Sequence, residues 1–532
     1  MEQQHKRGRE ESGEQLAEEA RQTHSVQHRR RERELPLPEL LMLLNTNDEG
    51  ALMDVCSKIR ERFAGEAGLQ QLMSETVLPF LTEGLKHPAA RVRELTLTQL
   101  ERLAEHPQQG QPLLVSAGFV PLLIAALKDQ SLGVVEAATK ALLSLQQHQP
   151  QGQELVFSDP NLSLFSDMLQ ESDILRFRVL DLVGRSSILS PQTFQRVQHF
   201  FSPVLEELRG VEEDTDMLEK LNILPLLEKI MESETGLRYL DAAGAFQILH
   251  SLLTNESPYA SVLTPSILNL IAKIAQKVHF FCFVHSLLLA YDFLLAGDET
   301  LKGDASYDLV FKVPFWEPIH QHLSGEDETC AEAATVAVGL IARTRAGMSA
   351  LMGAQSATWR ELVSHFRSLR KPLCYSSLYA FGEAMNCPDE ELTEQAFDLA
   401  ESESGDSLMR QFMKFLEQPF PDLRNAVFAA LQGACTNLWA LSTKLFLRPG
   451  FFEFITNRST ETTKEGKEWK YAILQTLYKL STAQNKAGRP PSKELLREAV
   501  GSEKYEVVER YLRNGVFYVR GEHQLEMETR GA

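Results

Sequence analysis

Cysteine is scarce in this 532-residue sequence, and its spacing follows no pattern. No two cysteines form a C-x-x-C pair, and all six stand singly: Cys56, Cys282, Cys330, Cys374, Cys387 and Cys435. Disulfide frameworks and structural zinc sites both need cysteines at close, regular spacing. We therefore expect reduced, buried thiols, and neither a metal site nor a cofactor.

The motifs of the common enzyme chemistries are also absent. The sequence holds no G-x-x-x-x-G-K-[ST] phosphate loop, no H-E-x-x-H metal motif and no G-x-S-x-G nucleophile elbow. His320 and His322 form an H-x-H pair, but one such pair without further ligands rarely binds a metal. These absences predict a protein that is not an enzyme and has no catalytic residues.

An excess of basic residues is missing too. The 73 Asp and Glu residues outnumber the 54 Lys and Arg residues, which gives a net charge of −19. Nucleic-acid binding needs a basic surface for phosphate contacts, so this charge argues against it. It suits a soluble protein of the cytoplasm, and also of the nucleus, whose partner has a basic face.

The N-terminus lacks the apolar core of a secretory signal. Residues 1–35 mix both charges and carry almost nothing apolar, which predicts a disordered or frayed helical tail. The run "RRRER" at Arg29–Arg33 reads as a solvated charge run, with a nuclear localisation patch as the alternative.

What the sequence does have is an internal repeat. Residues 77–111 and 119–153 align when shifted by 42 positions, so that Pro79 falls on Pro121, Leu100 on Leu142 and Gly110 on Gly152. A third copy follows from residue 161, and each copy reads as an apolar helix, a polar turn and a longer second helix. A period near 40 with two helices per unit is typical of HEAT or armadillo repeats.

One such hairpin cannot be stable alone. Its buried side chains contribute on the order of 10 kcal/mol, whereas ordering about 40 residues costs several times more. Stacking against both neighbours supplies the remaining burial, and the second helices then line one continuous face. We expect a binding surface at their outward positions, in two rows: Thr98, Lys140 and Asp181, then Arg102, Ser144 and Arg185.

Degenerate copies continue to the C-terminus, and strand-like alternation is nearly absent. The fold class is therefore predicted to be all-α, a HEAT/armadillo-type α-solenoid, over residues 36–515. A tail is predicted at each end, over residues 1–35 and 516–532. The molecule is expected to be a monomer before it binds its partner.

The segment 278–298, "VHFFCFVHSLLLAYDFLLAGD", interrupts this scheme as an atypical apolar insertion. Its length would allow a membrane span, but it carries His279, His285 and Asp292, and a carboxylate inside the bilayer is costly. A buried extra helix is the favoured interpretation, with a translated intron or similar artefact as the second. No membrane association is expected.

The run 447–474 raises the question of an active-site loop. "PGFFEFITN" reads as a first helix whose Phe451, Phe452 and Ile455 face the core, and the polar stretch after it reads as a lengthened turn. The second helix then carries an apolar face made of Trp469, Ile473, Leu477 and Leu480. No reacting group stands there, so this run is predicted to be a turn between two helices.

Several of these runs carry a family resemblance. "EQPFPDLRNAVFAALQGAC", the run "LRPGFFEFITNRSTETTKEGKEWKYAIL" and the terminal "YLRNGVFYVR" resemble the C-terminal third of the 26S proteasome non-ATPase regulatory subunit 5 family. "HPAARVRELTLTQL" and "DILRFRVLDLV" are similar to its N-terminal repeats. The resemblance covers residues 75–515 patchily; the N-terminal tail and the segment 278–298 depart from it.

The resemblance implies a function that periodicity alone does not give. Members of the family are chaperones that bind an AAA-ATPase subunit of the proteasome regulatory-particle base through that subunit's C-terminal domain. They escort it during assembly and are absent from the finished proteasome. Arg424 and Arg458, within the resembling runs, complete the candidate partner contacts.

One alternative function remains open at this point. An armadillo-type adaptor for transport or scaffolding would grip an extended peptide with regularly spaced Asn and Trp residues. Here the asparagines are irregular, and the four tryptophans are confined to the second half, as Trp316, Trp359, Trp439 and Trp469. The chaperone interpretation is therefore preferred.

Overall fold

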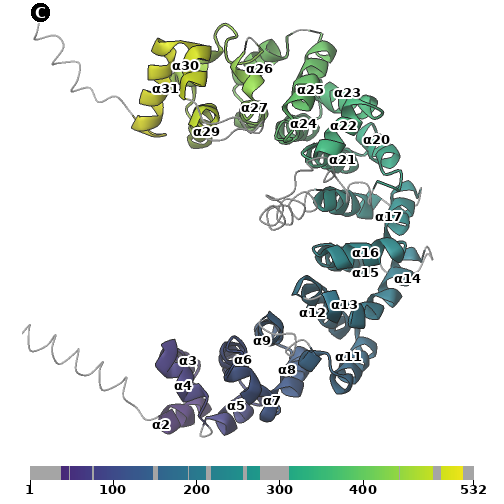
Figure 1. Cartoon of the computed structure of the whole chain (residues 1–532), viewed down its shortest axis with the longest axis vertical. Coiled ribbons are helices and arrows are strands. Elements are labelled where there is room, and N and C mark those ends of the chain that lie inside the picture. The colour runs from purple at the N-terminus through teal and green to yellow at the C-terminus, as the bar shows by residue number, and fades with distance from the viewer. Residues whose placement is uncertain are drawn as a thin grey trace, which may run out of the picture. The chain divides into compact units, whose positions relative to one another are not determined.

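The computed structural model describes eleven ranges of the chain, and every regular element in them is a helix. The ranges are 37–46, 48–74, 77–147, 154–189, 191–210, 217–255, 261–275, 311–405, 407–442, 444–482 and 493–518. The prediction of an all-α repeat fold is confirmed. The charged tail 1–35, the apolar segment 278–298 and most of the tail 516–532 lie outside the described residues. The chain divides into two compact units, Met1–Phe201 and Ser202–Ala532, and their helices can be followed in Figure 1.

In unit 1, short helices alternate with longer ones, and a longer helix closes each repeat. Its helices, in chain order, are α2 (Leu37–Met42), η1 (Leu43–Asn45), α3 (Glu49–Arg62), α4 (Gly65–Leu72), α5 (Leu78–Leu85), α6 (Ala90–Ala104), α7 (Gly110–Ser116), α8 (Phe119–Ala125), η2 (Ala126–Lys128), α9 (Leu132–Gln147), α11 (Asp159–Glu171), α12 (Asp173–Leu189), α13 (Pro191–Val197) and η3 (Gln198–Phe201). The long helices α6 and α9 pack directly against each other, and α9 packs against α12.

Unit 2 continues the same scheme over more repeats. Its first part holds α14 (Ser202–Arg209), α15 (Met217–Ile230), α16 (Glu234–Ala242), α17 (Ala245–Thr254) and a helix over Ser261–Ala275. Its second part holds α20 (Trp316–Leu323), α21 (Glu328–Ala342), α22 (Arg345–Met352), α23 (Ser356–Ser364), η4 (His365–Arg367), α24 (Lys371–Ala384), α25 (Glu390–Glu403), α26 (Leu408–Leu416), α27 (Pro421–Ala434), η5 (Leu438–Leu441), α28 (Phe451–Thr456), η6 (Arg458–Thr460), α29 (Lys464–Thr482), α30 (Lys493–Val500) and α31 (Ser502–Asn514).

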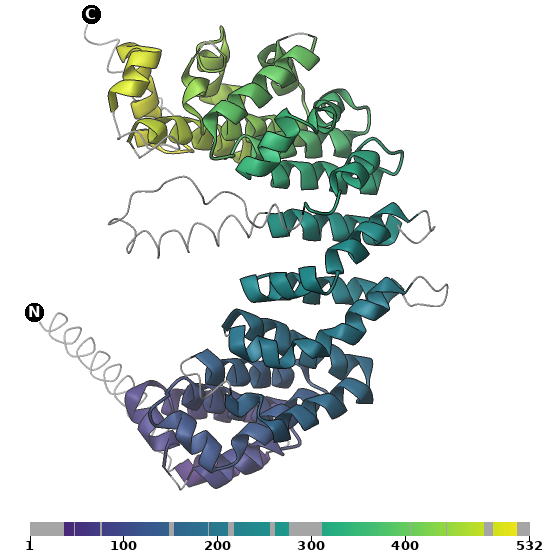
Figure 2. The same cartoon turned by 45° about the vertical axis from the view of Figure 1, so that its right-hand side comes forward.

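In unit 2, the part of the chain before residues 276–310 contacts the part after them. His322 Nε2 lies 3.0 Å from the carbonyl oxygen of Leu253, and the Cys330 thiol lies 3.7 Å from that of Ser261. The helices α21, α24, α27 and α29 pack in sequence, each against the next. Figure 2 shows the helices of unit 2 stacked side by side.

Most repeats contain three helices rather than the two that the sequence predicts. A short helix opens the repeat, as α7 does before α8 and α9, or α22 before α23 and α24. The predicted second helix is then the third, and we call it the final helix of its repeat. The opening helices are only seven to nine residues long in α7, α16 and α22, too short for their apolar periodicity to stand out from a turn.

A glycine in the first turn of the opening helix explains the repeated glycine of the sequence. A Cβ added at Gly110 would lie 2.0 Å from the carbonyl oxygen of Leu103, at the end of the preceding final helix. At Gly347 the corresponding distance, to the Ile341 oxygen, would be 2.2 Å. The opening helix therefore crosses the end of the final helix at a separation that only glycine allows.

The final helices of unit 2 also approach one another through small residues. A Cβ at Gly433 of α27 would lie 2.1 Å from the carbonyl oxygen of Gly382 in α24, and Gly339 of α21 rests on Ala380. Behind this row, aromatic rings fill the core, with Trp359 and Phe381 stacked at 5.7 Å between ring centroids. The row is thereby held in one register, which fixes the side chains on its outward face.

The run 447–474 is the predicted turn between helices. Phe451, Phe452 and Ile455 of α28 are buried. Ile473, Leu477 and Leu480 of α29 are also buried, whereas Trp469 is only half-buried. The residue fully buried beside it is Lys470, whose ammonium donates hydrogen bonds to the Asn457 carbonyl at 2.6 Å and the Thr460 hydroxyl at 2.5 Å.

Burial lowers the pKa of Lys470 to about 8, an effect that the nearby Glu461 opposes and Arg458 reinforces. Its ammonium thus anchors the lengthened turn from inside the repeat.

Membrane-spanning candidates are weak in the part of the chain that is described. No single helix there combines the length and the hydropathy that a span requires. Only the bent pair of Gly110–Ser116 and Phe119–Lys128 meets the length and composition criteria jointly.

Candidate functional site

The predicted binding face is the outward side of the final helices, and the structure places the predicted residues unevenly on it. Thr98 is half-buried on α6 and donates its hydroxyl to the Glu94 carbonyl at 2.9 Å. Ser144 is only 7% exposed, so the prediction that it points outward is wrong. Its helix α9 packs against a neighbouring final helix on either side in the sequence, α6 and α12, so fewer of its positions are open to solvent than in an isolated hairpin.

Arg102 points back into the fold. Its guanidinium donates to the carbonyl oxygen of Phe63 and, at 3.4 Å, to that of Gly65. Phe63 follows the end of α3, where the last carbonyls of a helix lack helical partners, and Gly65 is the first residue of α4. Arg102 thus joins α6 to the preceding repeat.

The other three predicted residues of unit 1 come together. Arg185 lies 2.9 Å from the Asp181 carboxylate in its own helix and 3.8 Å from Glu136 of α9. Lys140 also reaches Glu136, at 3.8 Å. Two cations and two carboxylates therefore pair with one another across α9 and α12.

Arg424 is a structural clamp between two repeats of unit 2. Its Nε and Nη2 donate to the two carboxylate oxygens of Glu461 at 3.0 and 3.1 Å, and its Nη1 donates to the Gln418 carbonyl at 2.8 Å. The side chains of Arg424 and Glu461 are 11% and 1% exposed. The prediction that Arg424 points outward to a partner is wrong, since its donors are used inside the unit.

Unit 1 contains the same clamp at the same place in its repeat. Arg93, like Arg424, is the fourth residue of a final helix. It donates to both oxygens of Asp129, at 2.7 and 2.8 Å, and to the carbonyl of His87 in its own turn, at 2.7 Å. The hydrogen bonds from Arg93 hold the pKa of Asp129 below its ordinary value despite partial burial.

Arg458 anchors the C-terminal helix. Its guanidinium donates to the carbonyls of Val516 at 2.7 Å and Tyr511 at 2.8 Å, and it lies 3.7 Å from the centre of the Tyr511 ring. These contacts tie η6 to α31. They occupy the group that was expected to face a partner.

The sequence did not predict a solvent-exposed face on the final helices of unit 2. Tyr375 and Tyr379 lie one turn apart on α24, and Tyr379 is 41% exposed. Asp422 at the start of α27 and Glu465 at the start of α29 lie beside them. The Tyr-x-x-x-Tyr spacing in a repeat helix was the available signal. We call Val336, Glu332, Tyr375, Tyr379, Asp422 and Glu465 the tyrosine face.

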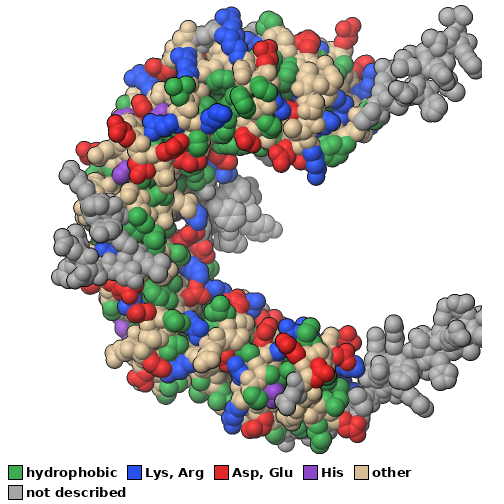
Figure 3. All heavy atoms as spheres, turned by 180° about the vertical axis from the view of Figure 1, so that it is seen from behind, with side chains coloured by type: hydrophobic (Ala, Val, Ile, Leu, Met, Phe, Trp, Pro, Cys, Tyr) green, Lys and Arg blue, Asp and Glu red, His purple; other side chains and the backbone are tan. Residues whose placement is uncertain are grey.

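Charge of both signs and apolar side chains are interspersed over the visible surface of both units (Figure 3). Two acidic side chains cap helices: Asp327 accepts the backbone N–H of Cys330 at 3.0 Å, and Asp389 accepts those of Glu391 and Leu392.

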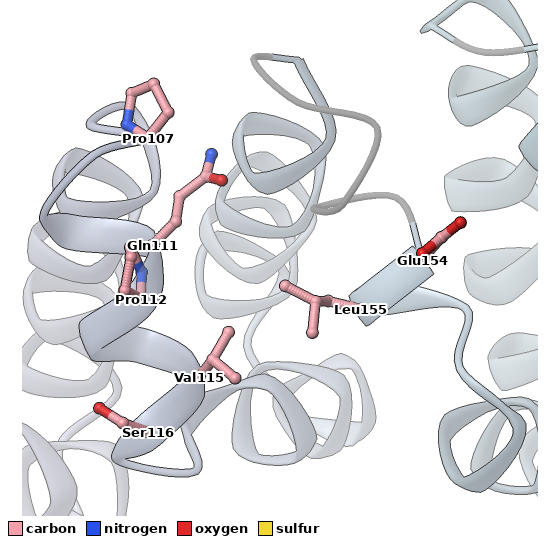
Figure 4. A pocket seen from close by; sticks show the side chains of 7 residues that line it. All are labelled: Pro107, Gln111, Pro112, Val115, Ser116, Glu154 and Leu155. Atoms are coloured by element: carbon pink, nitrogen blue, oxygen red, sulfur yellow. The ribbon is translucent and has the colours of Figure 1, made fainter.

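A cavity of about 630 Å³ lies beside α7, shown in Figure 4. Val115 and Leu155 face it from two sides. The side-chain amide of Gln111 donates to the carbonyls of Ala104 and Leu145 at 2.8 and 3.4 Å. Among the described residues that line it, Glu154 alone is ionisable. The cavity can accept an apolar side chain, but it brings together no nucleophile and base.

Metal and thiol chemistry find no support among the described residues either. No group of three or more His, Cys, Asp or Glu side chains there could hold a metal ion. His320 and His322 turn to different neighbours, Thr358 at 3.3 Å and Leu253 at 3.0 Å. The described cysteines are all buried, and none of them forms a disulfide.

We expect these cysteines to react slowly while the chain is folded. Burial raises the pKa of the Cys330 and Cys374 thiols from 9.0 to about 11, which lowers the reactive thiolate about 100-fold near neutral pH. Alkylation with iodoacetamide, followed by peptide mass spectrometry, should label both at least about 100-fold more slowly in buffer than in urea. Labelling of either at the rate of a free thiol would show that the final helices open readily.

Comparisons with known proteins agree with the runs noted in the sequence. A family model described as the proteasome non-ATPase 26S subunit matches residues 5–302 and 313–532. The human 26S proteasome non-ATPase regulatory subunit 5 is 24% identical over 523 residues, which cover 94% of each chain. The mouse protein of the same name is 24% identical, covering 92% of this chain and 90% of its own.

Solved structures give more distant matches. An engineered protein aligns with a TM-score of 0.38 and 16% identity, covering 82% of this chain and 98% of its own. A designed armadillo repeat protein aligns with a TM-score of 0.28 and 17% identity, covering 44% of this chain and 99% of its own.

Proposed function

Because the chain belongs to the family of 26S proteasome non-ATPase subunits, as its sequence runs predicted, we propose that it is an assembly chaperone of the proteasome base. In this proposal it binds one AAA-ATPase subunit through that subunit's C-terminal domain and leaves before the mature proteasome forms. The observation that carries the proposal is the family match over residues 5–302 and 313–532. Neither this family nor a helical repeat fold is of an enzymatic kind.

The fold supports a mechanism by occupancy. Final helices that pack side by side present one broad face in each unit, and a folded domain can rest on such a face without inserting a peptide. While the chaperone covers part of the ATPase subunit, other subunits cannot reach that part. Release follows when the growing complex competes for the same surface, so no covalent step and no nucleotide are required of this chain.

Capture from cell extract tests the proposal. Tagged chain should recover an ATPase subunit of the base together with its early assembly partners, and native gels should show it on these small species only. Recovery of intact 26S particles in stoichiometric amounts would make the chain a resident subunit and would contradict the chaperone role. Recovery of no ATPase subunit would contradict the proposal altogether.

A further inference from the structure

The tyrosine face has an apolar centre. Two contacts set the register of its helices: Ser376 donates to Glu332 at 2.7 Å, and Gly339 rests on Ala380. In sequence, Val336 lies between these contacts on α21, and Tyr379 lies between them on α24. Both are about 40% exposed, so an aliphatic side chain and an aromatic ring are open to solvent at the middle of this helix row.

Carboxylates surround that centre without cations to balance them. Among the described residues, Glu332, Asp422 and Glu465 form no ion pair. Arg424 is paired with Glu461, and Lys371, in the first turn of α24, lies 4.6 Å from the centre of the Phe420 ring and keeps its charge there. Three carboxylates without ion pairs outnumber that one lysine, so the tyrosine face is acidic.

The tyrosine hydroxyls lie within the electrostatic influence of two of these carboxylates. Burial raises the pKa of both tyrosines, and the charge of Asp422 raises it further. Glu465 adds to the effect on Tyr379. Rings flanked by carboxylates in this way suit lysine or arginine, whose charge pairs with the acids while the side chain lies against the ring.

The chemistry of the occupant follows from these charges. A second copy of this chain is a poor candidate, because each copy carries a net charge of −19 and the copies repel. Nucleic acid is repelled for the same reason. A basic surface of another protein meets both the charge and the aromatic rings, and burial of exposed tyrosines is a common source of binding energy at protein interfaces.

We propose that the tyrosine face of unit 2 is the contact for a lysine- or arginine-rich patch on the C-terminal domain of the ATPase subunit. This inference rests on the proposed function and adds the place and the chemistry of the contact. Tyr379 is the central residue, and Asp422 and Glu465 provide the charge. The ion pairs of α9 and α12 in unit 1 are not part of this contact.

The test compares two matched double variants with the wild type, using the purified C-terminal domain of each base ATPase subunit as the probe. One is Tyr379→Ser with Asp422→Asn. The control is Tyr518→Ser with Asp173→Asn, since Tyr518 is also 41% exposed and Asp173 also lies in the first turn of a final helix. Urea unfolding of each variant, followed by tryptophan fluorescence, shows that unit 2 is folded.

The tyrosine-face variant should bind about 30-fold more weakly than the wild type, as expected for a central aromatic contact. Its affinity should also fall less between about 50 and 200 mM salt, because one charge contact is missing. The control should bind within about twofold of the wild type. If the tyrosine-face variant keeps wild-type affinity and salt dependence, this inference is wrong while the proposed function stands; if the wild type binds no domain, the proposed function itself fails.

One other occupant is available within the chain, the basic run of Arg29–Arg33. Deletion of residues 1–35 distinguishes it. Our proposal expects the deleted chain to bind the ATPase domain within about twofold of the full chain. A tenfold gain in affinity would assign the tyrosine face to the tail and would overturn the proposal.

Discussion

Replacing Gly347 with alanine should lower the free energy of unfolding of unit 2 by at least about 3 kcal/mol. The added Cβ would lie 2.2 Å from the carbonyl oxygen of Ile341 and 2.8 Å from its carbonyl carbon. That carbonyl also accepts the Thr344 hydroxyl at 2.8 Å, and Thr344 in turn accepts the N–H of Gly347 at 3.0 Å. The backbone cannot yield to the methyl group without breaking this cap.

Tryptophan fluorescence during urea unfolding measures the effect, because all four tryptophans lie in unit 2. Gly210→Ala is the matched control, since a Cβ there meets nothing nearer than 3.4 Å. We expect its free energy of unfolding to stay within about 0.5 kcal/mol of the wild type. Equal free energies of unfolding for Gly347→Ala and the control would show that the opening helix does not cross the final helix so closely.

Arg424→Ala should destabilise unit 2 by about 3 to 5 kcal/mol, because it leaves the carboxylate of Glu461 buried without its cation. Burial alone would raise the pKa of Glu461, but hydrogen bonds from Arg424 and Thr463 outweigh it and the pKa is lowered. The same urea titration measures the loss. Arg345→Ala serves as the control: its pair with Asp389 joins side chains that are 69% and 21% exposed, so about 1 kcal/mol or less is expected.

The lowered pKa gives this clamp a pH dependence. In the unfolded chain Glu461 binds its proton near its ordinary pKa of 4.5, whereas in the folded chain it does so only at lower pH. Its stabilisation is therefore complete above the ordinary pKa and is lost as the pH falls through the folded pKa. In Arg424→Ala that acid sensitivity should shrink. An unchanged pH profile would indicate that Glu461 does not depend on Arg424.

The sequence predicts the fold well because burial repeats along it. Residues such as Leu100 and Leu142 recur at the repeat period, and each final helix buries them on one face. The sequence shows that Gly110 recurs in the repeat, but it does not show why glycine is needed there. That need comes from the close crossing of two helices, which the pattern of one helix cannot reveal. The opening helices were missed since seven to nine residues show too little periodicity.

The binding surface was harder to predict for a physical reason. Arg102 and Arg424 look like solvent-facing charges in their own helices, yet their partners stand 39 and 37 residues away, in neighbouring repeats. Lys470 shows the reverse case, a charged residue that is fully buried where Trp469 was expected. Tyr379 could have been found from its spacing to Tyr375 on a final helix, but its surroundings of carboxylates come from α27 and α29.

If these stacked repeats hold a folded domain by surface contact alone, the purified chain should bind the C-terminal domain of one base ATPase subunit without nucleotide. Light scattering measures the mass of the products when the chain is mixed with each of these domains. We expect a one-to-one complex with one of them. Mixtures that give only the separate masses would show that these repeats do not hold such a domain.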